Sequence, residues 1–270
     1  MKVNIFKAGK YNIDFNKKII IMGILNLTPD SFSDGGMWNN SDIAIERALE
    51  IEKLGADILD IGGQSTRPGF TKISAQDEWN RIYPVLKNLN KKINIPISID
   101  TFYPEVAENA LNMGADIVND ISGFSDKNMF NVVSKTECGI IVVHNSNSIN
   151  IKHFFENMID KLVSYGIDKT RICLDPGIGF KPNRNQDKFI INNLNDFRVD
   201  NLPMLVGISR KRVISEFYNS EVNNDLLLQG NIVANTLAIA NGANILRVHD
   251  IKESVFTSQI AKNIIEQQNI

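Results

Sequence analysis

Short apolar segments alternate with longer amphipathic segments along most of the chain. The apolar segments are uniformly apolar rather than alternating, a pattern typical of strands in a parallel sheet that is covered on both faces. Eight such segments predict strands: residues 19–25, 57–62, 95–100, 116–121, 139–144, 171–175, 203–208 and 244–249.

The segments between these strands have the periodicity of amphipathic helices. In residues 42–54, apolar side chains recur at the spacing of one helical face, as Ala44, Ala48 and Ile51 show. The same pattern predicts helices over residues 75–89, 103–113, 128–135, 152–165, 187–194, 226–240 and 253–267. A glycine that supplies a left-handed C-cap ends several of them: Gly55, Gly114 and Gly242.

Regular alternation of strands and helices predicts an α/β fold with a parallel sheet. Eight units in a chain of 270 residues match a (β/α)8 TIM barrel, and a doubly wound open sheet is the alternative. A short N-terminal β-hairpin is predicted from Val3–Phe6 and Asn12–Phe15, and residues 219–225 are predicted to form a surface loop. Without a linker or a break in composition, we expect residues 1–270 to be a single domain.

Charge and composition narrow the classes of function. The chain has 29 basic and 31 acidic residues and no long basic run, so binding to nucleic acid or to a membrane surface has no electrostatic support. We expect no membrane-spanning segment and no signal peptide, hence a cytoplasmic protein. Cys138 and Cys173 lie in apolar runs and are expected to be buried, reduced thiols.

Nearly every predicted strand ends in residues that are costly to bury. In a parallel barrel these strand ends meet at one mouth, so we expect them to form an active site that takes small molecules. The candidates are Asn26, Asp100, Asn119, Asp175, Lys211, Arg247 and His249.

The chemistry of these residues indicates two halves of a ligand. Asp100, Asn119 and Asp175 suit a flat, nitrogen-rich heterocycle, although helix capping by Asp100 and turn formation by Asp175 are alternatives. Lys211, Arg247 and His249, with the amide oxygen of Asn26 as a metal ligand, suit a di- or triphosphate. Because Arg247 lies inside an apolar segment, it needs an anionic partner.

Seven ordered motifs resemble those of the dihydropteroate synthases. They are GILNLTPDSFSDGG (23–36), DIGGQSTRPG (60–69), SIDTFYPEVAENAL (98–111), IVNDISG (117–123), LDPGIGF (174–180), LVGISRK (205–211) and ILRVHD (245–250). The resemblance implies a (β/α)8 barrel that condenses 6-hydroxymethyl-7,8-dihydropterin diphosphate with p-aminobenzoate in folate biosynthesis. It also implies a requirement for Mg2+, a target of sulfonamides and a homodimer.

The resemblance also assigns roles by position. Asp100, Asn119, Asp175 and Lys211 would hold the pterin, Arg247 and His249 the diphosphate, and Asn26 the Mg2+. Ser65, Thr66, Arg67, Pro68, Phe180 and Ser209 would form the p-aminobenzoate site. Catalysis would rest on Lys211, Arg247 and Asp100, in a dissociative substitution at the pterin methylene that is dominated by stabilisation of the leaving diphosphate.

The chain departs from the family pattern near the rim of the site. The departures are Phe124 for a glycine, Val143 for a methionine, Gln64 for a glutamate, and Lys181-Pro182 after the LDPGIGF motif. Two other functions stay open: a pterin-binding methyltransferase, and a catalytically silent pterin-binding subunit. A silent subunit would be expected to lose Asn26, Arg67 or Lys211, and all three are present.

Overall fold

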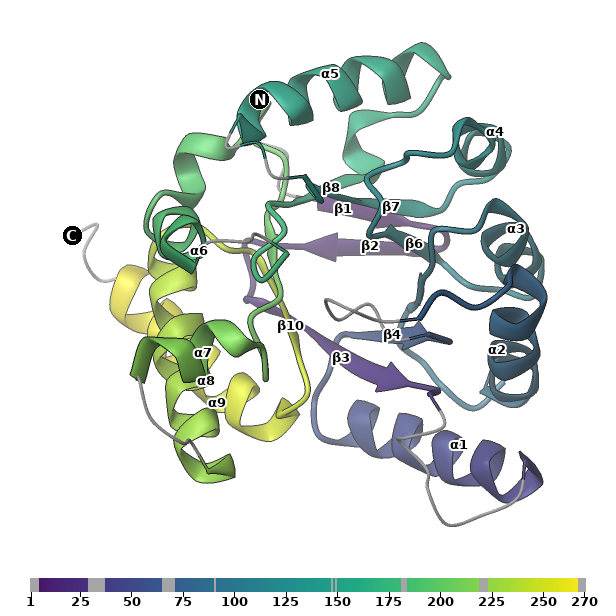
Figure 1. Ribbon diagram of the computed structural model, residues 1–270, viewed down its shortest axis with the longest axis horizontal. Helices are drawn as coiled ribbons and strands as arrows, with labels where there is room; N and C mark the ends of the chain where they lie inside the picture. Colours follow the sequence, from purple (N-terminus) through teal and green to yellow (C-terminus); the bar gives the residue numbers. More distant parts are fainter. Residues whose placement is uncertain are drawn as a thin grey trace.

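Eight parallel strands form the centre of the computed structural model (Figure 1), which describes residues 5–28, 37–64, 71–89, 91–146, 148, 150–180, 184–218 and 223–266. The strands are β3 (Ile20–Asn26), β4 (Ile58–Gly62), β5 (Ile97–Asp100), β6 (Ile117–Asp120), β7 (Gly139–Val143), β8 (Ile172–Asp175), β9 (Leu205–Val206) and β10 (Ile245–Val248). They pair in the order β8-β7-β6-β5-β4-β3-β10-β9, and a parallel bridge between Leu174 and Met204 joins the two outer strands. The sheet therefore closes into a TIM barrel, and the open-sheet alternative is wrong.

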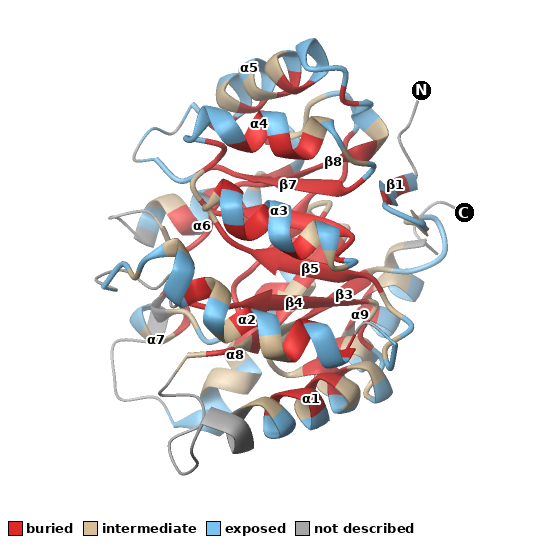
Figure 2. Ribbon diagram, turned by 90° about the vertical axis from the view of Figure 1, so that its right-hand side faces the viewer, coloured by how far each residue is buried: buried red, intermediate tan, exposed pale blue. Residues whose placement is uncertain are grey.

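Helices surround this barrel on the outside. In Figure 2 the strands are buried, while the helices turn one buried face inward and one exposed face outward. The helices are α1 (Met37–Lys53), α2 (Ala75–Leu89), α3 (Pro104–Asn112), α4 (Lys127–Ser134), α5 (Ile151–Ser164), α6 (Arg184–Asn192), α7 (Arg212–Tyr218), α8 (Asn224–Ala240) and α9 (Ile251–Glu266). Two short 3-10 helices, Lys169–Arg171 and Leu194–Phe197, precede β8 and β9.

Side chains alternate along each strand between two apolar clusters. Outward residues such as Ile21 and Leu59 pack against the helices, whereas inward residues such as Met22 and Ile58 fill the barrel. This explains why the strands are apolar on both faces, as the sequence predicts. Because the period is two residues, the inward series continues from Ile58 to Asp60 and from Ile245 to Arg247.

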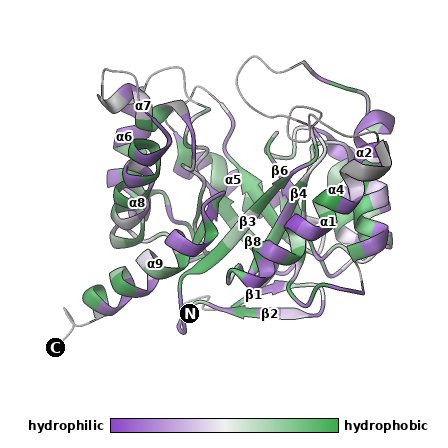
Figure 3. Ribbon diagram, turned by 90° about the horizontal axis from the view of Figure 1, so that it is seen from below, coloured by the Kyte–Doolittle hydropathy of each residue, from purple (hydrophilic) through white to green (hydrophobic). Residues whose placement is uncertain are grey.

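The N-terminal hairpin closes one end of the barrel. Strands β1 (Ile5–Ala8) and β2 (Tyr11–Asp14) pair antiparallel, and Figure 3 shows them across the end where the strands begin. Phe6 is fully buried in the barrel cluster, and a Cβ on Gly139 would lie only 2.6 Å from its ring. With this end closed by apolar side chains, the opposite end is left for chemistry.

Most predicted elements are confirmed within two or three residues. Helix α1 begins five residues earlier than predicted, at Met37, and the short helix α7 was not predicted. Gly55, Gly114 and Gly242 have positive φ values, as helix C-caps require. Of the predicted 219–225 loop, residues 219–222 lie outside the described residues, and helix α8 already begins at Asn224. Within the described ranges, no helix is both long enough and apolar enough to cross a bilayer.

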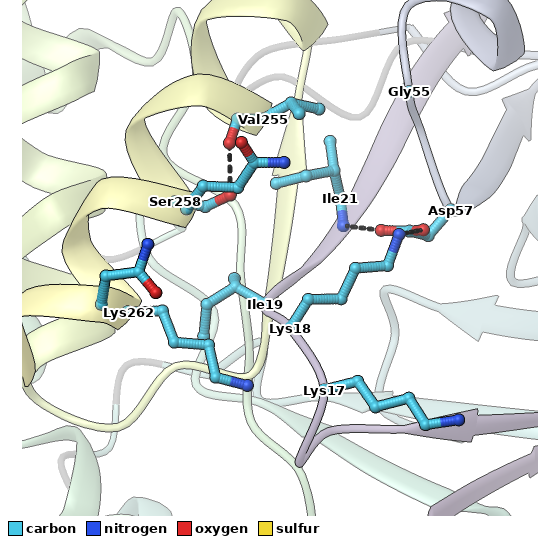
Figure 4. A pocket seen from close by; sticks show the side chains of 11 residues that line it. Lys17, Lys18, Ile19, Ile21, Gly55, Asp57, Val255, Ser258 and Lys262 are labelled. Carbon is cyan, nitrogen blue, oxygen red and sulfur yellow. Dashed lines mark hydrogen bonds and ion pairs between the residues drawn. The ribbon is translucent and has the colours of Figure 1, made fainter. Parts of the chain in front are cut away.

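A small pocket lies at the amino-terminal ends of β3 and β4, away from the predicted site. It has a volume of about 130 Å3 and is lined by Lys17, Lys18 and Lys262 among others (Figure 4). Its carboxylate, Asp57, is already engaged by Lys18 and by the backbone N–H of Ile21. The contacts of Asp57 therefore serve the structure of the barrel and do not indicate a ligand.

Candidate active site

Four neighbouring strands place three polar residues in one row at the carboxyl end of the barrel. In the sheet register, Asn26 pairs with Gly62, Gly62 with Asp100, and Asp100 with Asn119. Because Gly62 has no side chain, its neighbours approach each other across it: a Cβ there would lie 3.8 Å from both Asn26 Oδ1 and Asp100 Oδ2. The register thus gathers an amide, a carboxylate and a second amide at one place.

Arg247 lies between two carboxylates inside the barrel. Its Nε donates to Asp60 Oδ2 at 2.6 Å, and its Nη2 donates to Asp100 Oδ2 at 2.5 Å. The Asp60 side chain is fully buried and that of Arg247 is 16% exposed. These carboxylates are the anionic partners that an arginine in an apolar strand requires.

Oxygen atoms of three residues in this cluster lack a hydrogen-bond partner among the described residues. They are Asp60 Oδ1, Asp100 Oδ1 and Asn119 Oδ1, all of them buried. Buried polar atoms are normally paired, so unpaired acceptors at the carboxyl ends of the strands indicate a ligand that brings N–H donors.

Lys211 is held by the loop that follows β8. Its Nζ donates to the Ile178 carbonyl at 2.5 Å and lies 4.7 Å from the centre of the Phe180 ring. A Cβ on Gly179, which has a φ of +87°, would lie 2.5 Å from Lys211 Cδ. The loop is fixed in turn by Asp175, whose Oδ1 accepts the Gly177 N–H at 2.8 Å. The predicted turn role of Asp175 is therefore confirmed, and it coexists with the position of Asp175 at the carboxyl end of β8.

His249 and Ser209 contact each other. The Ser209 hydroxyl lies 3.2 Å from both the backbone nitrogen and the ring Nδ1 of His249. Ser209 was assigned by resemblance to p-aminobenzoate, whereas in the structure its hydroxyl orients the histidine assigned to diphosphate. The two assignments are compatible if Ser209 lies at the junction of both subsites.

Burial controls the charges at the mouth. Desolvation raises the pKa of Asp100 to about 7, although Arg247 lowers it; the carboxyls of Asp60, Glu78 and Asp120 contribute to the rise. Burial lowers the pKa of Lys211 to about 8, while the Asp175 carboxylate opposes this shift. Perturbed groups of both signs at one end of the barrel are typical of an active site.

Glu78, a further buried carboxyl, lies on helix α2 and contacts the segment that follows β4. Gln64, where the family pattern often has a glutamate, donates from Nε2 to Glu78 Oε2 at 2.6 Å. Burial raises the pKa of Glu78 to about 7, although hydrogen bonds from Thr101 and Gln64 lower it. Arg81 binds the neighbouring Gly63 carbonyl at 2.9 Å and also favours the charged form of Glu78.

We therefore expect Glu78→Gln to change how stability depends on pH. Because the folded-state pKa of Glu78 lies above its ordinary value of 4.5, its favourable contribution is complete below pH 4.5 and is lost as the pH rises through 7. The free energy of unfolding of Glu78→Gln, relative to wild type, should rise by roughly 3 kcal/mol between pH 4.5 and 7.5, at about 1.4 kcal/mol per tenfold change in acidity. Urea unfolding at both pH values measures this difference, and an equal offset at both would contradict the prediction.

The departures of the chain from the family pattern have visible structural settings. Phe124 adopts a φ of +60°, a conformation that favours glycine, and burial against Phe130, with ring centroids 5.3 Å apart, accommodates it. Val143 points into the barrel cluster, and His144 packs edge-on against the Phe154 ring at 4.9 Å.

The structure brings together most of the predicted site. One cluster contains Asn26, Asp100, Asn119 and Arg247. Lys211 lies close enough to Asp175 and Arg247 for their charges to shift its pKa. Helix capping by Asp100 is wrong, because α3 is capped at Tyr103 without a side-chain bond. The predictions for Ser65, Thr66, Arg67, Pro68, Lys181 and Pro182 lie outside the described residues.

Sequence reasoning missed Asp60. Its signal was available: Asp60 and Arg247 each interrupt an apolar strand at an inward position, and two opposite charges buried in one barrel are expected to pair. Cys138 and Cys173 are buried and free, as predicted.

Comparison with known proteins agrees with this geometry. Residues 22–249 match the family model of pterin binding enzymes. A dihydropteroate synthase of Clostridium beijerinckii is 36% identical over 97% of this chain and 100% of its own length.

Solved structures agree as well. A Clostridium difficile dihydropteroate synthase determined in the presence of pteroic acid has a TM-score of 0.89 and 41% identity, covering 93% of this chain and 98% of its own. A Xanthomonas albilineans dihydropteroate synthase with 4-aminobenzoic acid has a TM-score of 0.87 and 32% identity, covering 94% and 95%. The chain belongs to the dihydropteroate synthase family.

Proposed function

We propose that the Arg247 cluster is the reaction centre of this enzyme and that the residues around it divide the substrate between them. As a dihydropteroate synthase, the chain is a transferase that joins 6-hydroxymethyl-7,8-dihydropterin diphosphate to p-aminobenzoate, giving 7,8-dihydropteroate and diphosphate. The observation that carries the proposal is an arginine inside the barrel that pairs with the buried carboxylates Asp60 and Asp100, beside buried oxygens without partners among the described residues.

The pterin would occupy the side lined by acceptors. Asp100 and Asn119 present buried oxygens to the N–H groups of the ring, and the carboxylate of Asp175 suits its guanidine-like edge. Lys211 would donate to a ring acceptor once its Nζ leaves the Ile178 carbonyl. Its lowered pKa makes it a ready proton donor near neutral pH.

The residues present fit a Mg2+ ion that arrives with the diphosphate. No group of three or more His, Cys, Asp or Glu side chains in the described ranges could hold a metal without other ligands. Mg2+ usually keeps several waters and takes few protein oxygens besides substrate phosphates, and the Asn26 amide oxygen at the cluster supplies one. Bound there, Mg2+ would neutralise charge on the departing diphosphate.

The protein side chains then favour a dissociative substitution. Arg247 and His249 would stabilise the negative charge that develops on the leaving diphosphate, and the buried surroundings strengthen this interaction. The pterin ring stabilises the methylene cation that remains, and the aniline nitrogen of p-aminobenzoate attacks it. Since the nucleophile loses its proton only after attack, no strong general base is required.

We expect p-aminobenzoate to bind in an ordered manner. Phe180 lies beside Lys211, which we assign to the pterin, and Ser209 lies beside His249, which we assign to the diphosphate. Bound pterin and Mg2+-diphosphate would therefore form one wall of the p-aminobenzoate pocket. The affinity for p-aminobenzoate should rise about 5- to 150-fold when both are present, a coupling of about 1–3 kcal/mol. Calorimetric titration of p-aminobenzoate with and without these ligands tests this, and equal affinities would show that the pocket is preformed.

We further infer a homodimer. Helices α8 and α9 pack against each other and carry half of the exposed large apolar side chains found among the described residues: Leu226, Val233, Leu237, Phe256, Ile260 and Ile264. Exposed apolar surface of this kind is typical of a protein interface. A second copy of the chain is the partner that the family resemblance implies.

A turnover assay tests the proposed function. Incubation with pterin diphosphate, p-aminobenzoate and Mg2+ should release one diphosphate for each dihydropteroate formed. Diphosphate release without dihydropteroate would contradict condensation, and the absence of both would favour a silent pterin-binding subunit. Methyl transfer from methyltetrahydrofolate in place of condensation would favour the methyltransferase alternative.

A further inference from the structure

One carboxylate contacts two residues that the proposed function assigns to different halves of the substrate. Asp60 Oδ2 accepts a hydrogen bond from Arg247 Nε at 2.6 Å and another from Asn119 Nδ2 at 3.4 Å. Asp60 lies on β4, whereas its partners lie on β10 and β6. It is fully buried, so these contacts are shielded from water.

Asp60 contacts only the Nε atom of the Arg247 guanidinium group. Nε is fixed by Asp60, while Nη2 is bound to Asp100 Oδ2 at 2.5 Å. When a pterin takes over Asp100, Nη2 is released, but the bond from Nε still holds the guanidinium in place. The terminal nitrogens are then free to form the two-pronged contact that arginine makes with phosphate oxygens.

The contact with Asn119 decides which atom of its amide faces the ligand. Because Nδ2 donates to Asp60, Oδ1 is the atom left over, and it has no partner among the described residues. A ring with N–H donors needs an acceptor at this position. If the amide turned over, a donor would meet the donors of the ring.

We propose that Asp60 is a positioning residue for this reaction, which fixes Arg247 for the diphosphate and orients the Asn119 amide for the pterin. The inference rests on the proposed function of those two residues. A merely structural Asp60 would neutralise the buried arginine, and its loss would lower stability without changing the affinity of the folded protein for either ligand.

The first test is the isosteric substitution Asp60→Asn, with Asp116→Asn as a matched control. An asparagine oxygen is a neutral acceptor, so it holds the donors of Arg247 and Asn119 more weakly than the carboxylate oxygen does. Its amide nitrogen is a donor and cannot replace the second carboxylate oxygen. Asp116 is also a buried aspartate of the sheet region, but its Oδ2 accepts the Ile97 N–H at the opposite end of the barrel, 3.1 Å away. Calorimetry should show Mg2+-diphosphate and 6-hydroxymethylpterin each binding at least ~10-fold more weakly to Asp60→Asn, and with unchanged affinity to Asp116→Asn.

Double mutants then separate positioning from structure. In the Arg247→Lys background no Nε exists, so Asp60→Asn should produce at most a small further loss of diphosphate affinity. In the Asn119→Ala background it should likewise have little further effect on 6-hydroxymethylpterin. Non-additivity of this kind identifies residues that act through one another.

Each outcome decides a definite question. Unchanged ligand affinities in Asp60→Asn would overturn the positioning role. So would an Asp60→Asn effect on affinity that is as large in the Arg247→Lys and Asn119→Ala backgrounds as in the wild-type protein. Wild-type diphosphate affinity in Arg247→Lys and Arg247→Ala alike would instead refute the proposed function of Arg247. If Asp60→Asn does not fold, Asp60→Ser, which is smaller and does not reach Arg247, is subject to the same titrations and the same criteria.

Discussion

Arg247→Ala should lose measurable binding of Mg2+-diphosphate while still binding 6-hydroxymethylpterin. The guanidinium is the cation that pairs with the buried carboxylates Asp60 and Asp100, and removing one partner of such a charged contact costs about 2–5 kcal/mol, or roughly 30- to 5,000-fold in affinity. The pterin should be spared, because the loss of Arg247 frees Asp100 Oδ2 for the ring.

Turnover of Arg247→Ala should fall at least as far as diphosphate affinity, since the same contact stabilises the leaving group. Calorimetry with the two ligands separately measures the contrast. Arg210→Ala is the matched control, because Arg210 is a neighbouring cation on the rim that pairs at 2.6 Å with Asp250. Diphosphate bound to Arg247→Ala as tightly as to wild type would show that the anion site lies elsewhere.

Asp175→Asn should weaken pterin binding by about 30-fold or more, since the loss of a buried charge-assisted hydrogen bond costs about 2–5 kcal/mol. The substitution can keep the loop intact, because an asparagine oxygen can still accept the Gly177 N–H. The other carboxylate oxygen, Oδ2, would be replaced by an amide nitrogen. This nitrogen is a donor and cannot accept the N–H groups of the pterin edge. The nearby Lys211 also loses a carboxylate that favours its charged form.

The titration of 6-hydroxymethylpterin into Asp175→Asn tests this directly. Asp116→Asn again serves as the control for replacing a buried aspartate by its amide. An unchanged pterin affinity would leave Asp175 with only its turn role, which was the alternative interpretation of its sequence.

The barrel was predictable because its physical causes are local. Each strand is apolar on both faces, whereas each helix has one apolar face. The two patterns differ, so strands and helices can be told apart in the sequence. Helix α7 was missed because it is only seven residues long and follows the active-site lysine directly, where the sequence has little room for periodicity.

Most residues of the site could be predicted from the sequence, but the contacts between them could not. Strand ends identify Asn26, Asp100, Asn119 and Asp175, since parallel strands meet at one mouth. The countercharge of Arg247 depends on which inward residue lies opposite it across the barrel, and residues 60 and 247 are far apart in the chain. The pairing of Gln64 with Glu78 depends likewise on how α2 packs on the sheet.

The most direct measurement is a crystal structure of the enzyme with pterin diphosphate and Mg2+. The pterin ring is expected against Asp100, Asn119 and Asp175, with Asn26 on the metal and the diphosphate against Arg247, whose Nε remains on Asp60. A diphosphate bound at the lysine-lined pocket at the other end of the barrel, or a pterin ring away from these three residues, would contradict the assignment.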